Sequence, residues 1–279
     1  MFALLESDRL SWFRTEHRFL NYTEISSHED YLRAVTSRDA ASTICMLGNG
    51  SNCLFASKTV KAFLLKNKLA KELTWNSEDE LWASSSVPLM SILKQCQKRS
   101  LDSFFYLSSV PATVGGAVAM NAGRGRGHNK TIFDYVQSVD VWTPEGTRSF
   151  LNEEIPREYR HTLFLDHPDW FIFGAKFKFP VVVQNDQKKS AIAQRVTYSQ
   201  DVQDHSGPNC GSVFKVFYPR ILARFRGVKL LGAHFSAKTQ NWMINRSKSH
   251  RGALFLIRLV VFLHFVLCRK CSLEIRIVK

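Results

Sequence analysis

The sequence predicts an α+β fold with mixed sheets, because short strands alternate with short helices along the chain. The composition is that of a globular protein, with 45% hydrophobic and 22% charged residues, which is enough to bury a core. A length of 279 residues predicts one large domain or two to three small ones.

The first part of the chain supplies much of this alternation. Residues 29–39 (EDYLRAVTSRD) predict a short helix with Leu32 and Val35 on one side. A strand at Thr43–Leu47 runs directly into the turn Gly48–Asn52. Three further elements follow in order: strands at Val60–Leu65 and Glu80–Ser84, and a helix at about Val87–Arg99.

The middle of the chain reads as β structure. Two strand-like runs, Val136–Trp142 and Thr147–Leu151, are separated by Pro144–Gly146, which indicates a hairpin. The stretch Phe171–Phe179 (FIFGAKFKF) alternates strongly and predicts a half-buried strand, which Pro180 ends.

The last third of the chain is expected to form a separate part. The polar stretch Gln184–Ser190 is the best candidate for a domain boundary, and residues 191–279 suffice for a small domain. Within them, Leu254–Cys268 is the most apolar stretch of the chain. A membrane span needs about 20 residues, and Arg258 and His264 interrupt this one. We therefore expect a buried helix packed against a sheet.

Charge and cysteine usage restrict the partners. The net charge of +14 favours anionic partners, whether nucleic acid, membrane or phosphorylated small molecules. No basic run alternates with stacking aromatics, so nucleic acid is not expected and a diphosphate ligand is favoured. The segment Met1–Leu10 contains acidic residues and no long apolar stretch, so it does not resemble a signal peptide. We therefore expect a cytoplasmic protein with reduced cysteines. Cys268 and Cys271 form a lone C-x-x-C; a structural zinc would need a second pair, so no metal is expected.

A Gly/Asn/Ser turn at Leu47–Asn52 is the first candidate binding site. Glycine permits backbone conformations that let amide groups converge on an anion. Asn49, Ser51 and Asn52 add neutral donors suited to a diphosphate held without a metal. A plain hairpin loop is the alternative interpretation.

A second, longer segment is more specific. Residues 108–123 read SSVPATVGGAVAMNAG, so that small side chains leave the backbone open to a flat ligand. Thr113 and Asn121 offer hydrogen bonds. A tightly packed glycine-rich bend is the alternative. Together, the two segments predict the two halves of one flavin-diphosphate clasp.

The two segments and four later matches, in the same order, resemble one known family. They are GNGSN, VPATVGGAVAMNAG, Glu158–Arg160, Cys210–Lys215 (CGSVFK), residues 232–245 (GAHFSAKTQNWMIN) and Leu273–Arg276. The pattern is similar to that of the UDP-N-acetylenolpyruvoylglucosamine reductases (UDP-N-acetylmuramate dehydrogenases), of their shorter type, over roughly residues 40–279.

The resemblance implies a vanillyl-alcohol-oxidase/PCMH-type, two-lobed FAD-binding fold with a C-terminal α+β substrate domain. The implied bounds are residues 1–66 for the first FAD-binding lobe, 67–183 for the second, and 191–279 for the substrate domain. It also implies an activity: FAD passes hydride from NADPH to the enolpyruvyl ether of UDP-N-acetylglucosamine enolpyruvate, giving UDP-N-acetylmuramate for peptidoglycan. A monomer without a membrane span, acting on a UDP-sugar in the cytoplasm, is expected.

Site residues carry over by position in the matched motifs. Ser212 matches the proton donor, and Arg160 and Glu274 match the residues that stabilise the enolate. The substrate-binding candidates are Lys215, Ser236 and Asn241. The FAD-binding candidates are Gly48, Asn49, Gly50, Ser51, Asn52, Pro111, Thr113, Gly115, Gly116, Asn121, Ala122 and Gly123.

Some positions depart from the family pattern. Val216–Phe217 stands where Asn-Pro is usual after F-K, and Thr239 replaces a histidine. Two alternatives therefore stay open: a flavoprotein oxidoreductase of the same fold with a different substrate, and a non-catalytic flavin-fold binding module.

Overall fold

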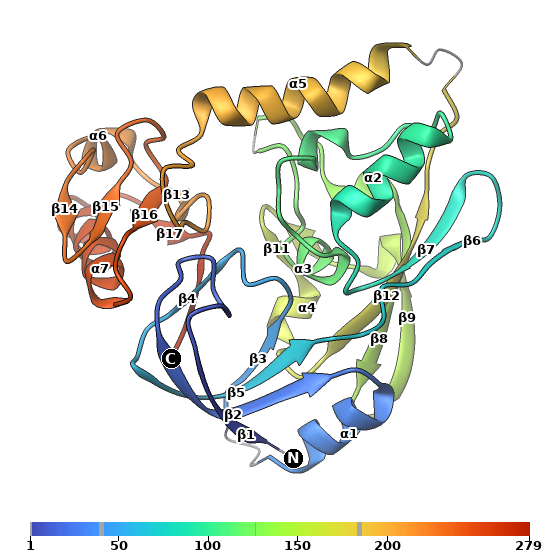
Figure 1. Ribbon diagram of the computed structural model, residues 1–279, viewed down its shortest axis with the longest axis horizontal. Coiled ribbons are helices and arrows are strands. Elements are labelled where there is room, and N and C mark those ends of the chain that lie inside the picture. The colour runs from blue at the N-terminus through green and yellow to red at the C-terminus, as the bar shows by residue number, and fades with distance from the viewer. Residues whose placement is uncertain (1, 39–41, 126, 183–185) are drawn as a thin grey trace. The chain divides into compact units, whose positions relative to one another are not determined.

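The chain divides into two units that alternate along the sequence (Figure 1). This computed structural model describes residues 2–38, 42–125, 127–182 and 186–279, the last range without the side chains of 186–190. Unit 1 comprises residues 23–49 and 63–199; unit 2 comprises residues 2–22, 50–62 and 200–279. The chain therefore changes unit within β2 (His17–Ile25), in the Gly48–Asn52 turn, within β5 (Thr59–Asn67), and within α5 (Asp186–Val202).

Unit 1 is built on a five-stranded antiparallel sheet with the order β6-β7-β12-β8-β9. Its strands are Leu73–Trp75 (β6), Glu80–Ser84 (β7), Val136–Thr143 (β8), Gly146–Leu151 (β9) and Phe171–Lys178 (β12). The central strand carries Gly174 because a β-carbon there would lie 2.4 Å from the Trp82 ring. The Trp82 indole in turn donates to Asp140 Oδ2 at 2.8 Å, which ties β7 to β8.

Short helices and further strand pairings complete unit 1. The helices are α1 (His28–Thr36), α2 (Leu89–Lys98), α3 (Val114–Ala119) and α4 (Leu163–Asp166), with 3-10 turns at Phe105–Leu107, Ile132–Asp134 and Asn152–Glu154. Strand β3 (Ile44–Leu47) pairs in parallel with β5, and β10 (Arg157–Glu158) pairs with β11 (His161–Thr162). Strands β3 and β5 belong to a four-stranded sheet with the order β1-β2-β5-β3, in which β1 is Ala3–Ser7. Buried aromatic side chains, among them Phe104, Phe177 and Phe179, fill the core between α2 and the sheet.

Unit 2 contains short strands and two helices around a second core. Its elements are β1 (Ala3–Ser7), β4 (Cys53–Phe55), β13 (Phe214–Val216), α6 (Pro219–Ala223), β14 (Lys229–Leu230), β15 (Ala233–Phe235), β16 (Met243–Asn245), α7 (Arg251–Val266), β17 (Ser272–Leu273) and β18 (Arg276–Val278). Strands β14-β15-β16 form one sheet, while β13 pairs with β17 and β4 pairs in parallel with β18. The core takes Phe13 and Leu54, both fully buried, from the early segments of the chain.

The predicted elements are largely confirmed. The strand Glu80–Ser84 agrees to the residue, and the hairpin forms around Pro144–Glu145. The predicted helix 29–39 is observed at His28–Thr36, and residue 39 lies outside the described residues. Of the stretch Gln184–Ser190, residues 186–190 begin α5 and 184–185 lie outside the described part of the chain. The division at 1–66, 67–183 and 191–279 stays a prediction.

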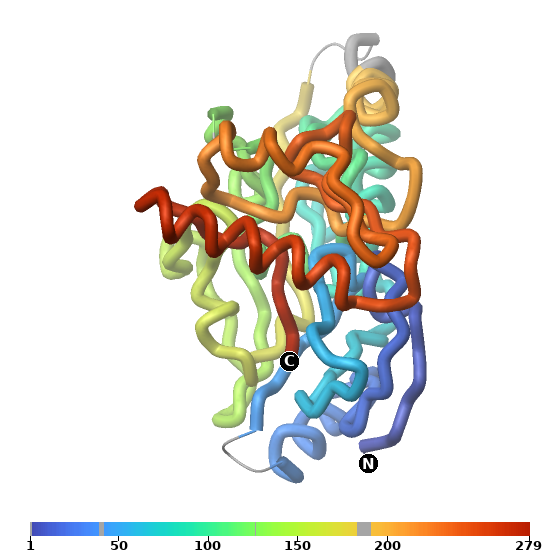
Figure 2. Tube along the Cα trace, turned by 90° about the vertical axis from the view of Figure 1, so that its left-hand side faces the viewer, coloured from blue at the N-terminus to red at the C-terminus, as the bar shows by residue number. Residues whose placement is uncertain are grey.

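The apolar stretch near the C-terminal end forms α7, an unbroken helix that is orange-red in Figure 2. It contacts β14, β15 and α6, so the predicted packing of a helix against a sheet is confirmed. The expectation of burial holds for one face only, because Phe255, Phe262 and Phe265 on the other face are exposed. Within the described residues, no helix is both long and apolar enough to cross a membrane.

Candidate functional site

The two glycine segments lie against each other inside unit 1. Gly48 follows β3, and a β-carbon at this position would lie 2.8 Å from Thr113 Oγ1. The Asn49 side-chain amide donates to the Pro111 carbonyl at 2.7 Å. The Lys66 ammonium donates to the Gly48 carbonyl, which fixes the turn from the neighbouring strand β5. The unit 1 parts of the two predicted segments therefore adjoin.

The second segment bends from an extended backbone into helix α3. Thr113 is extended and caps α3 without a side-chain hydrogen bond. Gly115 follows because a β-carbon there would lie 2.8 Å from Ser85 Cβ, and its amide donates to Ser85 O at 3.0 Å. Gly116 is different, since a β-carbon would meet Thr113 Oγ1 at an ordinary 3.6 Å. The glycine pair thus contains one residue required by packing and one that packing does not require.

Unsatisfied polar atoms concentrate in this segment. Ser108 Oγ, Thr113 Oγ1 and Asn121 Oδ1 are buried and lack a hydrogen-bond partner among the described residues. A buried polar group without a partner costs about 1–3 kcal/mol, so such groups are normally paired. Two hydroxyls and one carbonyl oxygen suit a ligand that carries both acceptors and donors, such as the phosphates and the flavin ring of FAD. The residues present therefore fit the implied cofactor.

Arg160 is anchored to the same segment. It occupies the turn between β10 and β11 with a positive φ of 59°, and its guanidinium donates to Asn121 O at 3.3 Å and Gly123 O at 2.9 Å. Asn121 also has a positive φ of 42°, and its amide donates to Glu158 O at 2.8 Å. The structure thus brings Arg160 to the Asn121–Gly123 end of the predicted clasp. Ala122 continues this end, with its carbonyl accepting from the Ile132 amide at 2.8 Å.

The rest of the first turn belongs to unit 2. Gly50 has a φ of 69°, and a β-carbon there would lie 2.1 Å from Leu10 O, so no larger residue fits. Ser51 and Asn52 are half-buried. The Asn52 amide donates to Glu274 O at 2.9 Å, and the Arg276 amide donates to Asn52 O at 2.9 Å. These bonds begin the β4–β18 pairing and place Glu274 beside the end of the turn.

Ser212 and Glu274 are brought together at one strand pair of unit 2. Ser212 follows Gly211, whose φ is 70°, and forms a bridge with Trp242. The next residue, Val213, accepts hydrogen bonds from the Glu274 amide at 2.9 Å and the Ile275 amide at 3.3 Å. Both predicted catalytic residues are half-buried. A hydroxyl and a carboxyl on adjacent chain segments can together move and stabilise a proton.

The three predicted substrate residues have different surroundings. Lys215 is half-buried in β13. The Asn241 side chain accepts from the Phe214 amide at 3.0 Å and donates to Phe214 O at 2.7 Å, so it holds β13 in place. Ser236 is fully buried; its hydroxyl donates to Asp204 Oδ2 at 2.6 Å. Burial opposes ionisation of Asp204, but hydrogen bonds from Ser236 and Ser206 hold its pKa below the usual range. Ser236 and Asn241 therefore make local hydrogen bonds, and their role in substrate binding stays a prediction.

Cys210, which precedes Gly211 and Ser212, is a buried thiol. Burial raises the pKa of Cys210 to about 12, although hydrogen bonds involving Ser11 and Cys53 oppose the shift. Its sulfur lies 3.4 Å from the Cys53 carbonyl, which the Ser11 hydroxyl also contacts at 2.6 Å. Burial therefore opposes ionisation of this thiol, and its sulfur packs the Gly211–Ser212 turn against β4.

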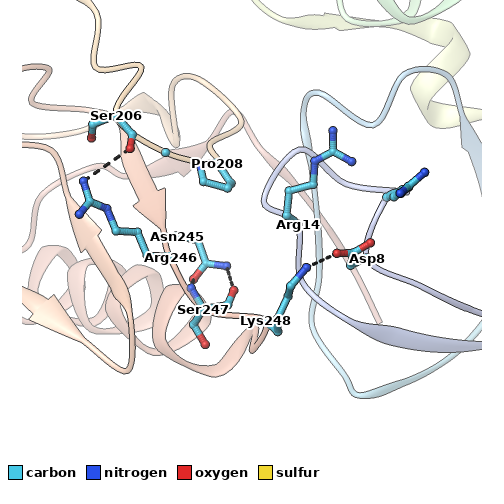
Figure 3. Close-up of a pocket in the computed structure, with 10 residues that line it drawn as sticks. Asp8, Arg14, Ser206, Pro208, Asn245, Arg246, Ser247 and Lys248 are labelled. Carbon is cyan, nitrogen blue, oxygen red and sulfur yellow. Dashed lines mark hydrogen bonds and ion pairs between the residues drawn. The ribbon is translucent and has the colours of Figure 1, made fainter.

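A basic pocket in unit 2 lies outside the predicted site residues (Figure 3). Its volume is about 740 Å³, and Arg9, Arg14, Arg246 and Lys248 contribute to its lining. The Lys248 ammonium pairs with the carboxylate of Asp8, which also lines the pocket, and this hydrogen bond holds the pKa of Asp8 below its usual range. Arg246 instead donates to the Ser206 carbonyl at 3.5 Å.

Two residues at the clasp were missed by sequence reasoning. Lys66 holds Gly48, and Ser85 packs on Gly115 while accepting from the Asn67 amide at 2.7 Å. Neither stands in a matched motif, and their partners lie far along the chain. The one available signal was that Lys66 directly follows the apolar run Val60–Leu65, which is common to many surface lysines.

Comparison with known proteins identifies relatives of this chain. A family profile described as an FAD binding domain matches residues 22–151. The UDP-N-acetylenolpyruvoylglucosamine reductase of Synechocystis sp. is 26% identical over 211 residues, covering 72% of this chain and 66% of the relative. The enzymes of the same name from Oceanobacillus iheyensis and Halalkalibacterium halodurans are 27% and 29% identical, covering 82% and 72% of this chain and 73% and 67% of theirs. The chain thus spans about two thirds to three quarters of these relatives.

A solved structure shows the same fold. The crystal structure of UDP-N-acetylenolpyruvylglucosamine reductase from Thermus caldophilus superposes with a TM-score of 0.79 and covers 100% of both chains at 20% identity. The predicted α+β, FAD-binding fold is therefore confirmed.

Proposed function

We propose that the chain, which belongs to the UDP-N-acetylenolpyruvoylglucosamine reductase family, is an FAD-dependent reductase. The proposed reaction uses NADPH to convert UDP-N-acetylglucosamine enolpyruvate to UDP-N-acetylmuramate, for peptidoglycan synthesis in the cytoplasm. The observation that carries the proposal is the concentration of unpartnered polar atoms, Ser108 Oγ, Thr113 Oγ1 and Asn121 Oδ1, in one glycine segment that adjoins the other.

FAD is the cofactor that these residues would hold. In the Pro111–Gly123 segment, the buried Thr113 hydroxyl would supply a donor and the Asn121 side-chain oxygen an acceptor. When bound, FAD supplies hydride transfer, from NADPH in one half-reaction and to the enolpyruvyl carbon C3 in the other.

The chain's own residues handle charge and protons. The Arg160 guanidinium is a permanent cation with a planar fork, suited to holding the substrate carboxylate and the negative charge that develops on it. The Ser212 hydroxyl donates a proton to C2. Glu274, one residue beyond the strand that pairs with β13, adds a hydrogen bond to the enolate in its protonated form. Lys215 on β13 is suited to the UDP diphosphate.

A flavoprotein of the same fold with another substrate is the second candidate. Thr239 stands at the family's histidine, and its hydroxyl donates to Val202 O at 2.9 Å, so this side chain is engaged with the end of α5. Val216 lies in β13, next to Lys215, where the family has a polar residue. Both changes affect residues on the substrate side of the proposed chemistry.

A spectroscopic experiment tests the proposal. Purified protein should be yellow, lose its flavin absorbance on addition of NADPH without oxygen, and regain it on addition of UDP-N-acetylglucosamine enolpyruvate. Failure of the last step with intact flavin would exclude the proposed substrate, and other enol ethers and nucleotide sugars would then be screened.

Replacement of Ser212 separates the two half-reactions. We expect Ser212→Ala to keep reduction by NADPH near normal and to slow the oxidative half-reaction by about 10²-fold or more, the usual range for a proton donor. Ser149→Ala, at an exposed position of β9, is the matched control. Equal losses in both half-reactions would mean that Ser212 has a structural role. Sedimentation of the pure protein tests the monomer that the family pattern implies.

A further inference from the structure

The outer face of α7 is apolar and exposed. Phe255, Phe262 and Phe265 are spaced by seven and three residues, which places them on one side of the helix. Their exposed fractions are 56%, 57% and 79%. Val261, Val266 and Leu267 are also exposed, so this outer face ends in a broad apolar surface; its residues are Phe255, Val261, Phe262, Phe265, Val266 and Leu267.

The fold does not need these side chains. The opposite face of α7 supplies the packing through residues such as Ala253, Leu256 and Val260, all buried. Gly252 lets the helix approach β14 closely, since a β-carbon there would lie 2.2 Å from Leu230 O. At the other end, His264 accepts from the Tyr218 amide at 2.9 Å. A surface helix held in this way normally carries polar residues outside, so three exposed phenylalanines indicate a binding surface.

A neighbouring loop extends this outer face. Leu231 is 62% exposed, and a β-carbon at Gly252 would lie 3.2 Å from Leu231 Cβ. Leu231 therefore sits beside the first turn of α7. Its backbone has a positive φ of 49°, which leucine rarely adopts, so the loop holds this apolar side chain outward at some cost.

Positive charges lie on the same side of the helix as the phenylalanines and just beyond its end, without acidic neighbours on the helix. Arg251, Arg258, Arg269 and Lys270 are all exposed, and residues 251–270 contain no Asp or Glu. The Arg269 guanidinium lies over the Tyr218 ring, 4.8 Å from its centre, and this contact holds one of these charges in place. A complementary partner must therefore offer an apolar region to the phenylalanines and anionic groups to the arginines and Lys270.

A second copy of the chain does not meet this requirement, because two such helices would bring arginine against arginine. A nucleic acid offers phosphates but no partner for the aliphatic Leu231, Val266 and Leu267. An anionic bilayer offers both, since amphipathic helices with Phe and Leu on one face and Lys and Arg beside it bind in the plane of the headgroups.

We propose that the outer face of α7, together with Leu231, binds the surface of an anionic lipid bilayer. The helix lies along the membrane and does not enter it as a span. Phenylalanine and leucine side chains enter the headgroup boundary, while the long arginine side chains of the same side and Lys270 reach the lipid phosphates. The proposal is independent of the reductase activity, because α7 contains none of the residues assigned to the reaction.

The test is co-sedimentation of the full chain with vesicles of phosphatidylcholine alone or mixed with phosphatidylglycerol. We expect binding to the mixed vesicles that weakens as salt rises. The variant Phe255→Ser/Phe262→Ser/Phe265→Ser and the variant Arg258→Gln/Arg269→Gln/Lys270→Gln should each bind at least about tenfold more weakly. Absorbance and thermal unfolding of the flavin-loaded variants verify that they fold.

Matched controls remove exposed apolar side chains and positive charges elsewhere. Leu4→Ser/Leu151→Ser/Val181→Ser replaces three equally exposed apolar residues, and Lys71→Gln/Lys94→Gln/Lys98→Gln removes the same charge. Both should bind like the original chain. Equal binding to the two vesicle types, or no loss in the α7 variants, would overturn the proposal. The proposal would also be overturned if the chain self-associated or bound a single-stranded oligonucleotide, and the phenylalanine variant alone abolished that interaction.

Discussion

At the residue scale, the buried hydroxyl of Thr113 affects the stability of the FAD-free protein and the binding of a ligand in opposite directions. Its hydroxyl is buried without a partner among the described residues, which costs free energy in the protein alone and gains a bond when a ligand supplies an acceptor. Thr113→Val keeps the shape of the side chain and removes the hydroxyl. We expect the FAD-free protein to be equally stable or more stable, by up to about 1 kcal/mol, and FAD to bind about tenfold more weakly.

Denaturant unfolding of the FAD-free protein and flavin fluorescence titration measure the two quantities. Thr74→Val, at an exposed position of β6, is the control and should change neither. Loss of stability without loss of FAD affinity would assign Thr113 to the fold alone.

His17 is a second residue with a measurable consequence. It is 2% exposed; Nδ1 donates to Ser57 O at 2.6 Å, and Nε2 accepts from the Thr15 hydroxyl at 2.6 Å. Burial lowers the pKa of His17 from 6.5 to about 4, with a further contribution from nearby His250. The unfolded chain therefore binds a proton between pH 6.5 and about 4 that the folded chain excludes, so stability falls as pH drops through this window.

The expected loss attributable to His17 is about 2 kcal/mol between about pH 7.5 and about pH 5. His17→Asn retains a donor for Ser57 and cannot be protonated, so its unfolding free energy should depend less steeply on pH. His128→Asn, at an exposed site, should keep the original slope. An unchanged slope in His17→Asn would show that other groups cause the acid sensitivity.

At the element scale, the glycine pair of α3 separates packing from ligand approach. A methyl group at Gly115 meets Ser85 Cβ at 2.8 Å, whereas at Gly116 its nearest neighbour is 3.6 Å away. We expect Gly115→Ala to lower the unfolding free energy by about 1–3 kcal/mol, as overpacking does. Gly116→Ala should leave the FAD-free protein unchanged or up to about 1 kcal/mol more stable, because alanine favours helix.

FAD affinity then distinguishes the two interpretations of the segment. If a ligand approaches the backbone at Gly116, the stable Gly116→Ala protein should bind FAD at least about tenfold more weakly. Isothermal titration with FAD measures this, and Gly127→Ala, at a site with no atom within 4 Å, is the control. Undiminished binding would leave the packed-bend interpretation for Gly116.

The elements show what a sequence can and cannot predict. Glu80–Ser84 and the hairpin at Pro144–Glu145 follow from local alternation and turn chemistry, so they were predictable. The contact between Gly48 and Thr113 was predictable only as a shared ligand site, because it joins distant segments. The exposed side of α7 was not predictable from hydrophobicity, since the helix is apolar on both faces and only its packing distinguishes them.

At the scale of the whole molecule, unit 2 depends on early segments of the chain. Phe13 and Leu54 are fully buried in its core, and β4 supplies the partner of β18. The sequence indicated a small domain at 191–279, but no local signal could show that this core needs residues 2–22 and 50–62. Pairing between segments far apart in the chain produces no periodic pattern in the sequence from which it could be predicted.

Two measurements test this dependence. We expect an isolated 200–279 fragment to show no cooperative unfolding transition, and Phe13→Ala to destabilise the full chain by about 3–5 kcal/mol, as for other buried phenylalanines. Phe255→Ala, on the exposed side of α7, should cost less than about 0.5 kcal/mol. Circular dichroism during denaturant unfolding gives both results. A cooperatively folding fragment would show that residues 200–279 form an independent domain.

The parallel pairing of β4 with β18 also limits when the protein can fold during its synthesis. Leu54 and Phe55 leave the ribosome early, whereas their partners Ile277 and Val278 come near the end of these 279 residues. Domains that fold during translation hide their apolar strands within seconds, but this strand must wait until almost all of this sequence has been made. The nascent chain therefore carries an unpaired apolar edge throughout elongation, and we expect a slow-folding, chaperone-dependent protein.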